Sequence, residues 1–516
     1  MKFSLRNPFW ILGLVLLWRA ALLVFTAQPI PANDAFFFDG SVVNWLTHGH
    51  YFNPAIADVF PISGTRIFSA YPPGYQGVAL IWMTVFGTSV ISSMALHLAL
   101  FAAAGFLALT IVKRFFPNWN NYFIVAWLFL GMTFGDRPED LAHVFGLGAL
   151  LLLARNLAGK AGNGGWKTAA GVTALLLAAL FTSPVGGGFY FGIGLMTVAL
   201  VWLTHRKSRV FLPFAVAAAM FAASVFVITR LEPLWWRGFM ENARFQSVVM
   251  VGFHLPRGLE IIKLIRNAPV FLLALGLVPV VLTRWKELAG DVWMQLTAGV
   301  FLAGSGLLVA NLTLLAPNYV AYVFFSQILL AAGLLALVEK YFPVRRRQFQ
   351  ILILACAALV SVRAVGMTTW GAVCAWKNSY GQTCKTLRVE LAPFCKTNTP
   401  VIISSPFLYG TIELGVQRPV HSDWYFDRTL TALSAGFDGF VRLRPAKLVL
   451  SQFDYHRAFL PMLERLRQQP ELVTVRVRDF AEVRPPDAIP ALARVVQHIS
   501  WAPVIVDLDW KNPPTP

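Results

Sequence analysis

The sequence has 516 residues, of which 57% are hydrophobic and only 13% are charged. Soluble proteins average about 45–50% apolar and about 25% charged residues, so the composition excludes an ordinary soluble domain. The formal net charge is +18, from 43 Lys and Arg against 25 Asp and Glu residues. The cations gather in short segments between apolar runs, which is typical of cytoplasmic loops and argues against a nucleic acid as partner.

The first apolar run covers about residues 8–28 and follows Lys2 and Arg6. The run is long and has no clear cleavage site of small residues before Pro29, so we interpret it as an uncleaved first helix. The two cations predict that the N-terminus lies in the cytoplasm. Arg19, in the middle of this helix, requires a partner or must reach the bilayer surface.

Residues 29–91 are predicted to form a first loop outside the cytoplasm. Within this loop, residues 35–46 predict an interfacial helix that carries several aromatic side chains. Residues 75–86 are apolar, but they are too few to cross a membrane and follow two prolines. We therefore predict a juxtamembrane or re-entrant helix there.

Apolar runs alternate with basic segments from residue 92 to residue 366. The alternation predicts about eleven crossings, the last at about 349–366, and further outer loops at 135–140 and 230–268. The protein is therefore expected to be a multi-pass protein of the plasma or inner membrane. Its C-terminus is expected outside the cytoplasm.

Charges and prolines return after residue 366. Short runs at 401–404, 447–450 and 472–477 predict strands, and residues 455–468 have the periodicity of a helix. The predicted fold is mainly α: a polytopic membrane bundle over residues 1–366, followed by a soluble α/β domain over residues 367–516.

The four cysteines are Cys356, inside a predicted span, and Cys374, Cys384 and Cys395 in or near the C-terminal domain. An oxidising exterior permits one disulfide, for which Cys374–Cys384 is the preferred pair, and three unlinked thiols are the alternative. Their spacing does not resemble a zinc site. The sequence indicates no cofactor, and whether the protein requires a divalent metal stays open.

Asp34 stands at the start of the first outer loop, beside bulky aromatic residues. Partial desolvation at the mouth of a membrane helix raises the pKa of a carboxyl and makes the carboxylate a stronger base. The alternative is that Asp34 caps the interfacial helix.

A second cluster of charges lies between two apolar spans and contains Asp136, Arg137, Glu139 and Asp140. Charges so close to the hydrocarbon indicate a water-filled cavity, and the alternative is a plain solvated loop. A third stretch, residues 230–266, mixes tryptophans with cations that include Arg237, Arg244 and Arg257. Arginine forks suit phosphate, and anchoring to lipid headgroups is the alternative.

These residue types fit one class of reaction. A sugar attached to a lipid phosphate already has a good leaving group, so transfer needs one carboxylate to deprotonate the acceptor and cations to hold the departing phosphate. Glycosidases instead need two carboxyl groups, because their leaving group is poor. A single base with arginines therefore favours transfer over hydrolysis.

The order of features resembles the GT-C superfamily of membrane glycosyltransferases, above all its protein O-mannosyltransferase and aminoarabinose transferase branch. The similar segments are Asn33-Asp34-Ala-Phe-Phe, Asn44–Asn53, Ala70-Tyr71-Pro-Pro-Gly-Tyr75, Asp136–Ala142 and Ala316-Pro-Asn318-Tyr319.

The resemblance implies an inverting transferase that uses a monosaccharide on polyprenyl phosphate. It implies that Asp34 is the base, with Asp39 as the second candidate. It also implies that Arg137 or Glu139 lines the active site. The substrate-binding residues that we expect, from the residue types and the resemblance together, are Tyr71, Arg137, Glu139, Asp140, Arg237, Arg244, Arg257 and Asn318. The implied partners are the lipid-linked sugar, an acceptor glycan, lipid or protein, and membrane lipid.

Two other functions remain open at this point. The first is a transporter or flippase for a lipid-linked or anionic substrate, although the sequence has no convincing internal repeat of the kind that transporters often contain. The second is a non-catalytic assembly or receptor protein that acts through residues 367–516.

Overall fold

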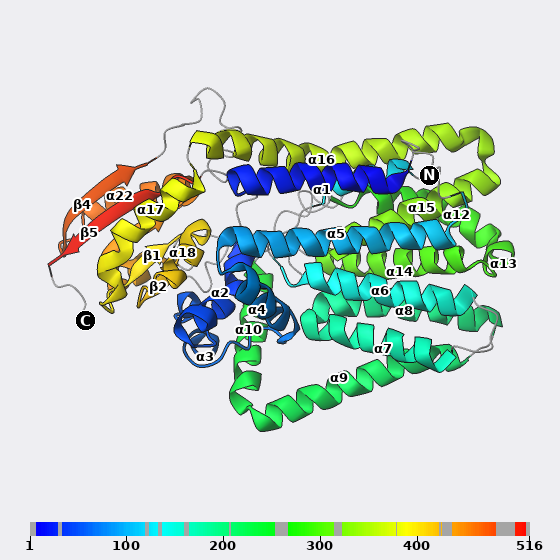
Figure 1. The fold of residues 1–516 in the computed structure, drawn as a ribbon, viewed down its shortest axis with the longest axis horizontal. Helices are drawn as coiled ribbons and strands as arrows, with labels where there is room; N and C mark the ends of the chain where they lie inside the picture. The colour runs from blue at the N-terminus through cyan, green and yellow to red at the C-terminus, as the bar shows by residue number, and fades with distance from the viewer. Residues whose placement is uncertain are drawn as a thin grey trace.

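The protein was analysed as a computed structural model, in which a helical bundle carries a small mixed sheet at one end (Figure 1). We call that end of the bundle the sheet end, and the other the opposite end. The first helix, Pro8–Thr26, starts near the opposite end, whereas the last strand, Val504–Trp510, belongs to the sheet (Figure 1). The structure describes residues 7–28, 33–118, 123–132, 137–158, 165–205, 208–252, 267–313, 322–377, 379–422, 425, 436–480 and 501–511.

Eight helices of the described residues are long and apolar enough to cross a membrane, which makes the protein an integral, multi-pass membrane protein. The total of about eleven crossings stays a prediction. These helices are α1 (Pro8–Thr26), α5 (Val90–Phe115), α6 (Glu139–Ala158), α8 (Pro184–His205), α9 (Leu212–Leu231), α14 (Val292–Thr313), α15 (Phe324–Tyr341) and α16 (Arg346–Lys377). Shorter apolar helices are α4 (Gly74–Phe86), α7 (Gly165–Thr182) and α12 (Pro269–Thr283), and α13 (Trp285–Leu288) follows α12.

Local signals set the ends of these helices. The Asn7 side chain accepts a hydrogen bond from the Phe9 N–H at 3.1 Å, and Pro8 occupies the first turn of α1. Ser89 caps α5 in the same way, and Lys113 and Arg114 stand in its last turn, where cations favour the helix dipole.

The return from α5 to α6 contains a 3₁₀ helix, η3 (Phe123–Leu130), which packs against α1 and α16. Gly131 follows it and lies against α16. A Cβ atom on Gly131 would come within 2.6 Å of the Val360 carbonyl carbon, so only glycine permits this approach.

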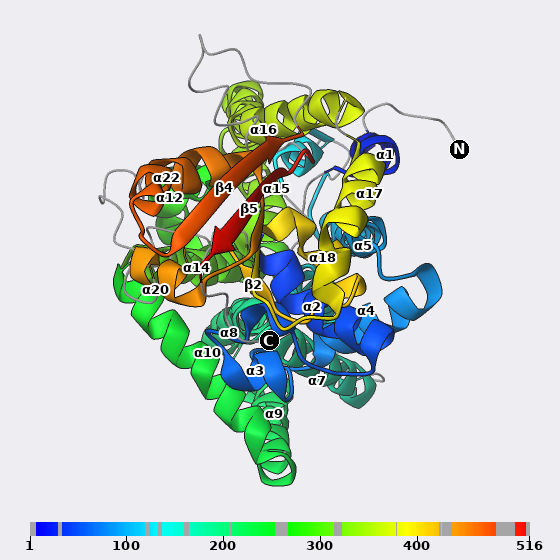
Figure 2. The same ribbon diagram turned by 90° about the vertical axis from the view of Figure 1, so that its left-hand side faces the viewer.

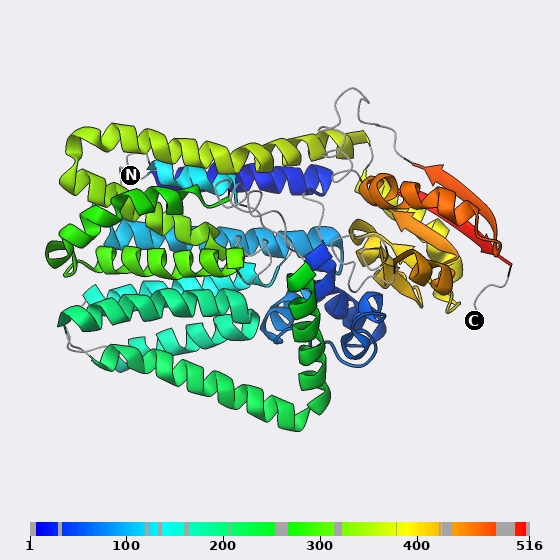
Figure 3. The ribbon, with the colours of Figure 1, turned by 180° about the vertical axis from the view of Figure 1, so that it is seen from behind.

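The expected helices of the first loop are present. They are α2 (Asn33–His48), where we predict residues 35–46, and α4, where we predict residues 75–86. Between them lie the short helices η1 (Pro54–Ile56) and α3 (Pro61–Thr65). Helix α10 (Pro233–Gly252) folds back from α9 across the sheet end and contacts α3 (Figure 3).

The sheet has the order β2-β1-β3-β5-β4, in which β1 runs parallel to β2 and β3, and β5 runs antiparallel to β3 and β4. Three strands confirm the predicted runs: β1 (Val401–Ile403), β3 (Lys447–Leu450) and β4 (Leu472–Asp479). The sequence analysis did not identify β2 (Pro419–His421) or β5 (Val504–Trp510). The associated helices are α17 (Tyr380–Leu391), α18 (Leu408–Glu413), α20 (Gly436–Leu443) and α22 (Leu460–Arg467).

The sheet domain and the first loop share one hydrophobic core. Phe38 and Val42 of α2 and Met94 of α5 belong to the same buried cluster as Phe407 and Leu408 at the start of α18. Figure 2 looks onto the sheet end and shows the sheet domain over the ends of the spans, with α18 beside α2. The sheet domain is therefore packed onto the bundle over an apolar contact.

The preferred disulfide is wrong, because all four cysteines are free thiols. Cys374 is completely buried near the end of α16, whereas Cys384 lies half-buried in α17, beside Tyr380. Helix α16 continues through the expected domain boundary at residue 366 and ends at Lys377.

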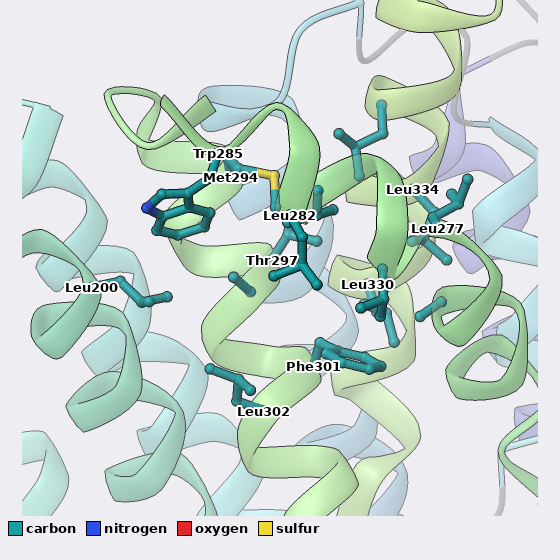
Figure 4. A pocket seen from close by; sticks show the side chains of 15 residues that line it. Leu200, Leu277, Leu282, Trp285, Met294, Thr297, Phe301, Leu302, Leu330 and Leu334 are labelled. Carbon is teal, nitrogen blue, oxygen red and sulfur yellow. The ribbon is translucent and has the colours of Figure 1, made fainter. Parts of the chain in front are cut away.

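An apolar cavity of about 350 Å³ lies between α8, α12, α14 and α15, toward the opposite end (Figure 4). Its lining includes Leu277, Leu282, Trp285, Phe301 and Leu334, and its walls offer almost no polar surface. The cavity is suited to hydrocarbon and contains none of the acidic residues singled out above.

Candidate active site

Helix α2 carries both candidate catalytic acids. Asp34 is the second residue of α2, and its side chain lies outside the described residues. Asp39 is completely buried. Its carboxylate accepts hydrogen bonds from the hydroxyls of Tyr75, at 2.7 Å, and of Ser93 and Tyr409. Three separate elements, α4, α5 and α18, thus converge on one side chain of α2.

A chain of hydrogen bonds continues from Asp39 into the bundle. The Tyr75 hydroxyl also lies 2.9 Å from Nε2 of His97, and Nδ1 of His97 lies 2.8 Å from Oδ2 of Asp140. His97 stands in α5, and Asp140 is in the first turn of α6. The chain therefore joins α2, which contains Asp34, to the start of α6.

The protons of this chain can be counted. The chain consists of three hydrogen bonds: Tyr75 to Asp39, Tyr75 to His97, and His97 to Asp140. Each hydrogen bond needs one proton, and an ionised carboxylate supplies none. If both acids are ionised, Tyr75 supplies one proton and His97 holds two, so the charges are two negative and one positive. If one acid holds a proton, His97 is neutral. The net charge of the four groups is one negative in either case.

Arg19 provides the positive charge nearby. It is buried in α1 and has a favourable Coulomb interaction with Asp140. Its guanidinium donates to the carbonyl oxygens of Phe129, at 3.1 Å, and Met132, and stands 4.5 Å from the Phe101 ring centroid. The mid-span cation therefore has the partners that the sequence analysis required.

Glu139 belongs to a second polar group beside the first. It is buried in the first turn of α6, and its Oε1 accepts from the Ser183 hydroxyl at 2.7 Å and the Tyr322 hydroxyl at 3.2 Å. Arg137 Nη1 donates to the Tyr322 oxygen at 3.5 Å. Arg137, Glu139 and Asp140 are therefore all at the sheet end of α6.

Helix α10 places two of the predicted phosphate-binding arginines at the surface. Arg237 and Arg244 are exposed. Helix α10 is also fixed to the first loop: Glu241 accepts from the Ile62 N–H at 3.2 Å, and Asn242 donates to the Ala70 carbonyl at 2.8 Å. Tyr71 follows Ala70 in the chain and packs edge-on against Phe38, with ring centroids 4.7 Å apart.

The structure thus brings together Asp39, Tyr71, Arg137, Glu139 and Asp140 at the sheet end, and α10 carries Arg237 and Arg244 across it. Asp136, Arg257 and Asn318 lie outside the described residues. Within the part of the chain that the structure describes, no group of three or more His, Cys, Asp or Glu residues could hold a metal ion.

Sequence reasoning missed Tyr75, His97, Ser183, Tyr322 and Tyr409. His97 carried a usable signal, because a histidine inside an apolar span needs a polar partner. Tyr75 stood in the Pro-Pro-Gly-Tyr segment that was already noted. Tyr409 carried no signal, because it lies 370 residues from Asp39.

The bundle, the first-loop helices and the appended sheet domain define a polytopic membrane protein with the GT-C fold. The crystal structure of ArnT from Cupriavidus metallidurans bound to undecaprenyl phosphate matches with a TM-score of 0.54 at 12% identity, over 96% of this chain and 98% of that one.

The same ArnT in the apo state matches with a TM-score of 0.48 at 12% identity, over 96% and 97% of the two chains. The Archaeoglobus fulgidus oligosaccharyltransferase in complex with Zn and sulfate matches with 0.44 at 12% identity, over 86% of this chain and 68% of that one. No family description and no curated protein matches the sequence.

Proposed function

We propose that the protein is a membrane glycosyltransferase that moves a monosaccharide from polyprenyl phosphate to an acceptor at the sheet end of the bundle. The observation that carries the proposal is the buried chain from Asp39 to Asp140, which joins the helix of Asp34 to the start of α6. The fold shared with ArnT, crystallised with undecaprenyl phosphate, supports the lipid donor.

The proposed orientation puts the sheet end outside the cytoplasm. Lys2 and Arg6 precede α1, which starts at the opposite end of the bundle, and Lys113 with Arg114 ends α5. Cations near the ends of spans favour the cytoplasmic side.

In the proposed reaction, the Asp34 carboxylate takes the proton from an acceptor hydroxyl. The acceptor oxygen then forms a bond to the anomeric carbon, while the bond from that carbon to the phosphate oxygen breaks. The electron pair leaves with polyprenyl phosphate, so no general acid is needed, and attack from the opposite side inverts the anomeric centre.

The remaining residues would bind the substrates. Arg137 donates to the Tyr322 hydroxyl, which in turn donates to Glu139. Together with Arg237 and Arg244 of α10 and with Arg257, Arg137 would hold the departing phosphate. Asp39 is completely buried under three hydroxyl donors, which favours a structural role for it and leaves Asp34 as the proposed base.

The test is transfer of radiolabel in membranes supplied with undecaprenyl phosphates that carry a labelled hexose, pentose or aminopentose. Asp34→Asn is expected to lower transfer about 10²- to 10⁴-fold, because the general base is lost. The matched control is Asp438→Asn, at an exposed acid of α20, which is expected to transfer at the wild-type rate. Normal transfer by Asp34→Asn would overturn the proposed mechanism.

A further inference from the structure

Tyr409 reaches from the sheet domain into the bundle. It stands in α18, its side chain is almost completely buried, and its hydroxyl donates to Asp39 and lies 3.1 Å from the Ser93 hydroxyl. Burial, and then the neighbouring Asp39 carboxylate, raise the pKa of Tyr409 well above its usual value. The hydroxyl therefore keeps its proton and acts on Asp39 as a donor.

The sheet domain holds α2 at a second point. His48, the last residue of α2, lies with its Nε2 2.9 Å from the Ile412 carbonyl oxygen of α18. Gly415, with φ +74°, stands next to the same ring, and a Cβ atom there would come within 3.0 Å of His48 Cε1. Helix α18 thus lies along α2 and contacts it at both Asp39 and His48.

We propose that Tyr409 is a positioning residue, by which the sheet domain fixes the first turns of α2 and thereby the base at Asp34. The role of Asp34 in this inference rests on the proposed function. Asp34 precedes Asp39 by five residues, or about 7.5 Å along a helix axis, so a restraint on Asp39 acts within two turns of the base.

The geometry explains why one hydroxyl matters. Asp39 is held by Tyr75 of the first loop and Ser93 of the span α5, and Tyr409 is the donor that the sheet domain adds. A base must lie within hydrogen-bond reach of the acceptor, and a shift of about 1 Å can cost up to about 10²-fold in rate. The sheet domain is then part of the catalytic framework of the enzyme.

The first test measures the position of α2 without any substrate. Amide hydrogen exchange is compared for the full-length protein and Tyr409→Phe in lipid nanodiscs. Peptides covering residues 33–40 are expected to exchange about tenfold faster in Tyr409→Phe, while the other spans keep their protection. Unchanged exchange of residues 33–40 would overturn the inference.

Two further variants serve as controls for this test. Tyr455→Phe removes a tyrosine hydroxyl elsewhere in the sheet domain and is expected to leave the exchange of α2 unchanged. His48→Ala removes the second contact and is expected to loosen residues 44–48, with residues 33–40 still protected. Loosening of the whole helix by Tyr455→Phe would contradict a specific role for Tyr409.

The second test is kinetic and uses the same labelled undecaprenyl phosphate sugars. Tyr409→Phe is expected to lower kcat about tenfold with KM for the donor unchanged, and to cause no further loss in the Asp34→Asn background. If the wild-type protein transferred no sugar, the proposed function would be rejected. The hydrogen-exchange test would still show whether Tyr409 positions α2. An active wild type with an equally active Tyr409→Phe would reject the inference alone.

Discussion

The two ends of the bundle differ in how exposed their charged side chains are. At the sheet end, Asp39, Glu139 and Asp140 are at most 9% exposed and are hydrogen-bonded by hydroxyl or imidazole groups. At the opposite end, Lys340 pairs with Asp291 at 3.6 Å, and their side chains are 42% and 43% exposed. Glu339, whose side chain is 10% exposed, is paired there with Arg346 at 2.8 Å.

The difference identifies where the protein accepts an energetic cost. Burying a carboxylate costs several kcal/mol unless hydrogen bonds and opposite charge compensate, whereas an exposed ion pair costs and contributes little. The buried carboxylates Asp39, Glu139 and Asp140 lie at the sheet end, in α2 and in the first turn of α6. Such a concentration is typical of a functional centre.

The largest effect on stability is expected at Asp39. Asp39→Ala removes the shared acceptor of three buried hydroxyls and leaves a small cavity, so it should destabilise the protein by about 3–5 kcal/mol. Unfolding by SDS in mixed micelles measures this loss.

The matched variant for Asp39 is Asp438→Ala, at an exposed position of the sheet domain, which should change stability by less than about 0.5 kcal/mol. If the two variants unfolded at the same SDS fraction, the contrast between buried and exposed acids would lose its basis.

A smaller effect is expected within the sheet domain, where Glu390 is 13% exposed and accepts two hydrogen bonds from Arg478, at 2.6 and 2.7 Å. Bonding to Arg478 and then to Lys447 lowers the pKa of Glu390 from 4.5 to about 2. Because the folded pKa is the lower one, the stabilisation is complete above pH 4.5 and is lost as the pH falls toward 2.

Thermal unfolding followed by tryptophan fluorescence at pH 6 and pH 3 tests this dependence. Glu390→Gln should remove about 2 kcal/mol of stability at pH 6 and about half as much at pH 3. The wild type and the variant should therefore converge as the pH falls. A constant difference between them at both pH values would show that Glu390 contributes through packing instead of charge.

The sequence predicted the apolar spans, α2 and three strands, because these depend on local runs and periodicity. It missed β2, which has three residues and begins with Pro419, a residue without the N–H of a regular strand. It also missed the 3₁₀ helix at 123–130, since apolar composition alone does not distinguish helix types.

The candidate site was predicted only in part. Their positions in the sequence placed Asp39, Arg137, Glu139 and Asp140 near the ends of spans, but did not show which residues they contact. These contacts join residues far apart in the chain, such as Tyr409 with Asp39 and Tyr322 with Glu139. Such contacts depend on how the helices pack, which no local pattern in the sequence specifies.

The smallest effect is expected at the opposite end, where Asp291→Asn removes the charge that faces Lys340. The residue precedes Val292, the first residue of α14, and asparagine is as good as aspartate at a helix start, so only the ion pair is lost. Stability should fall by less than about 0.5 kcal/mol, and the loss should shrink further in 1 M salt, because surface pairs are screened.

A loss as large as that of Asp39→Ala, and insensitive to salt, would mean that charge at this end is also buried and structural. The contrast between the two ends would then no longer support the candidate active site.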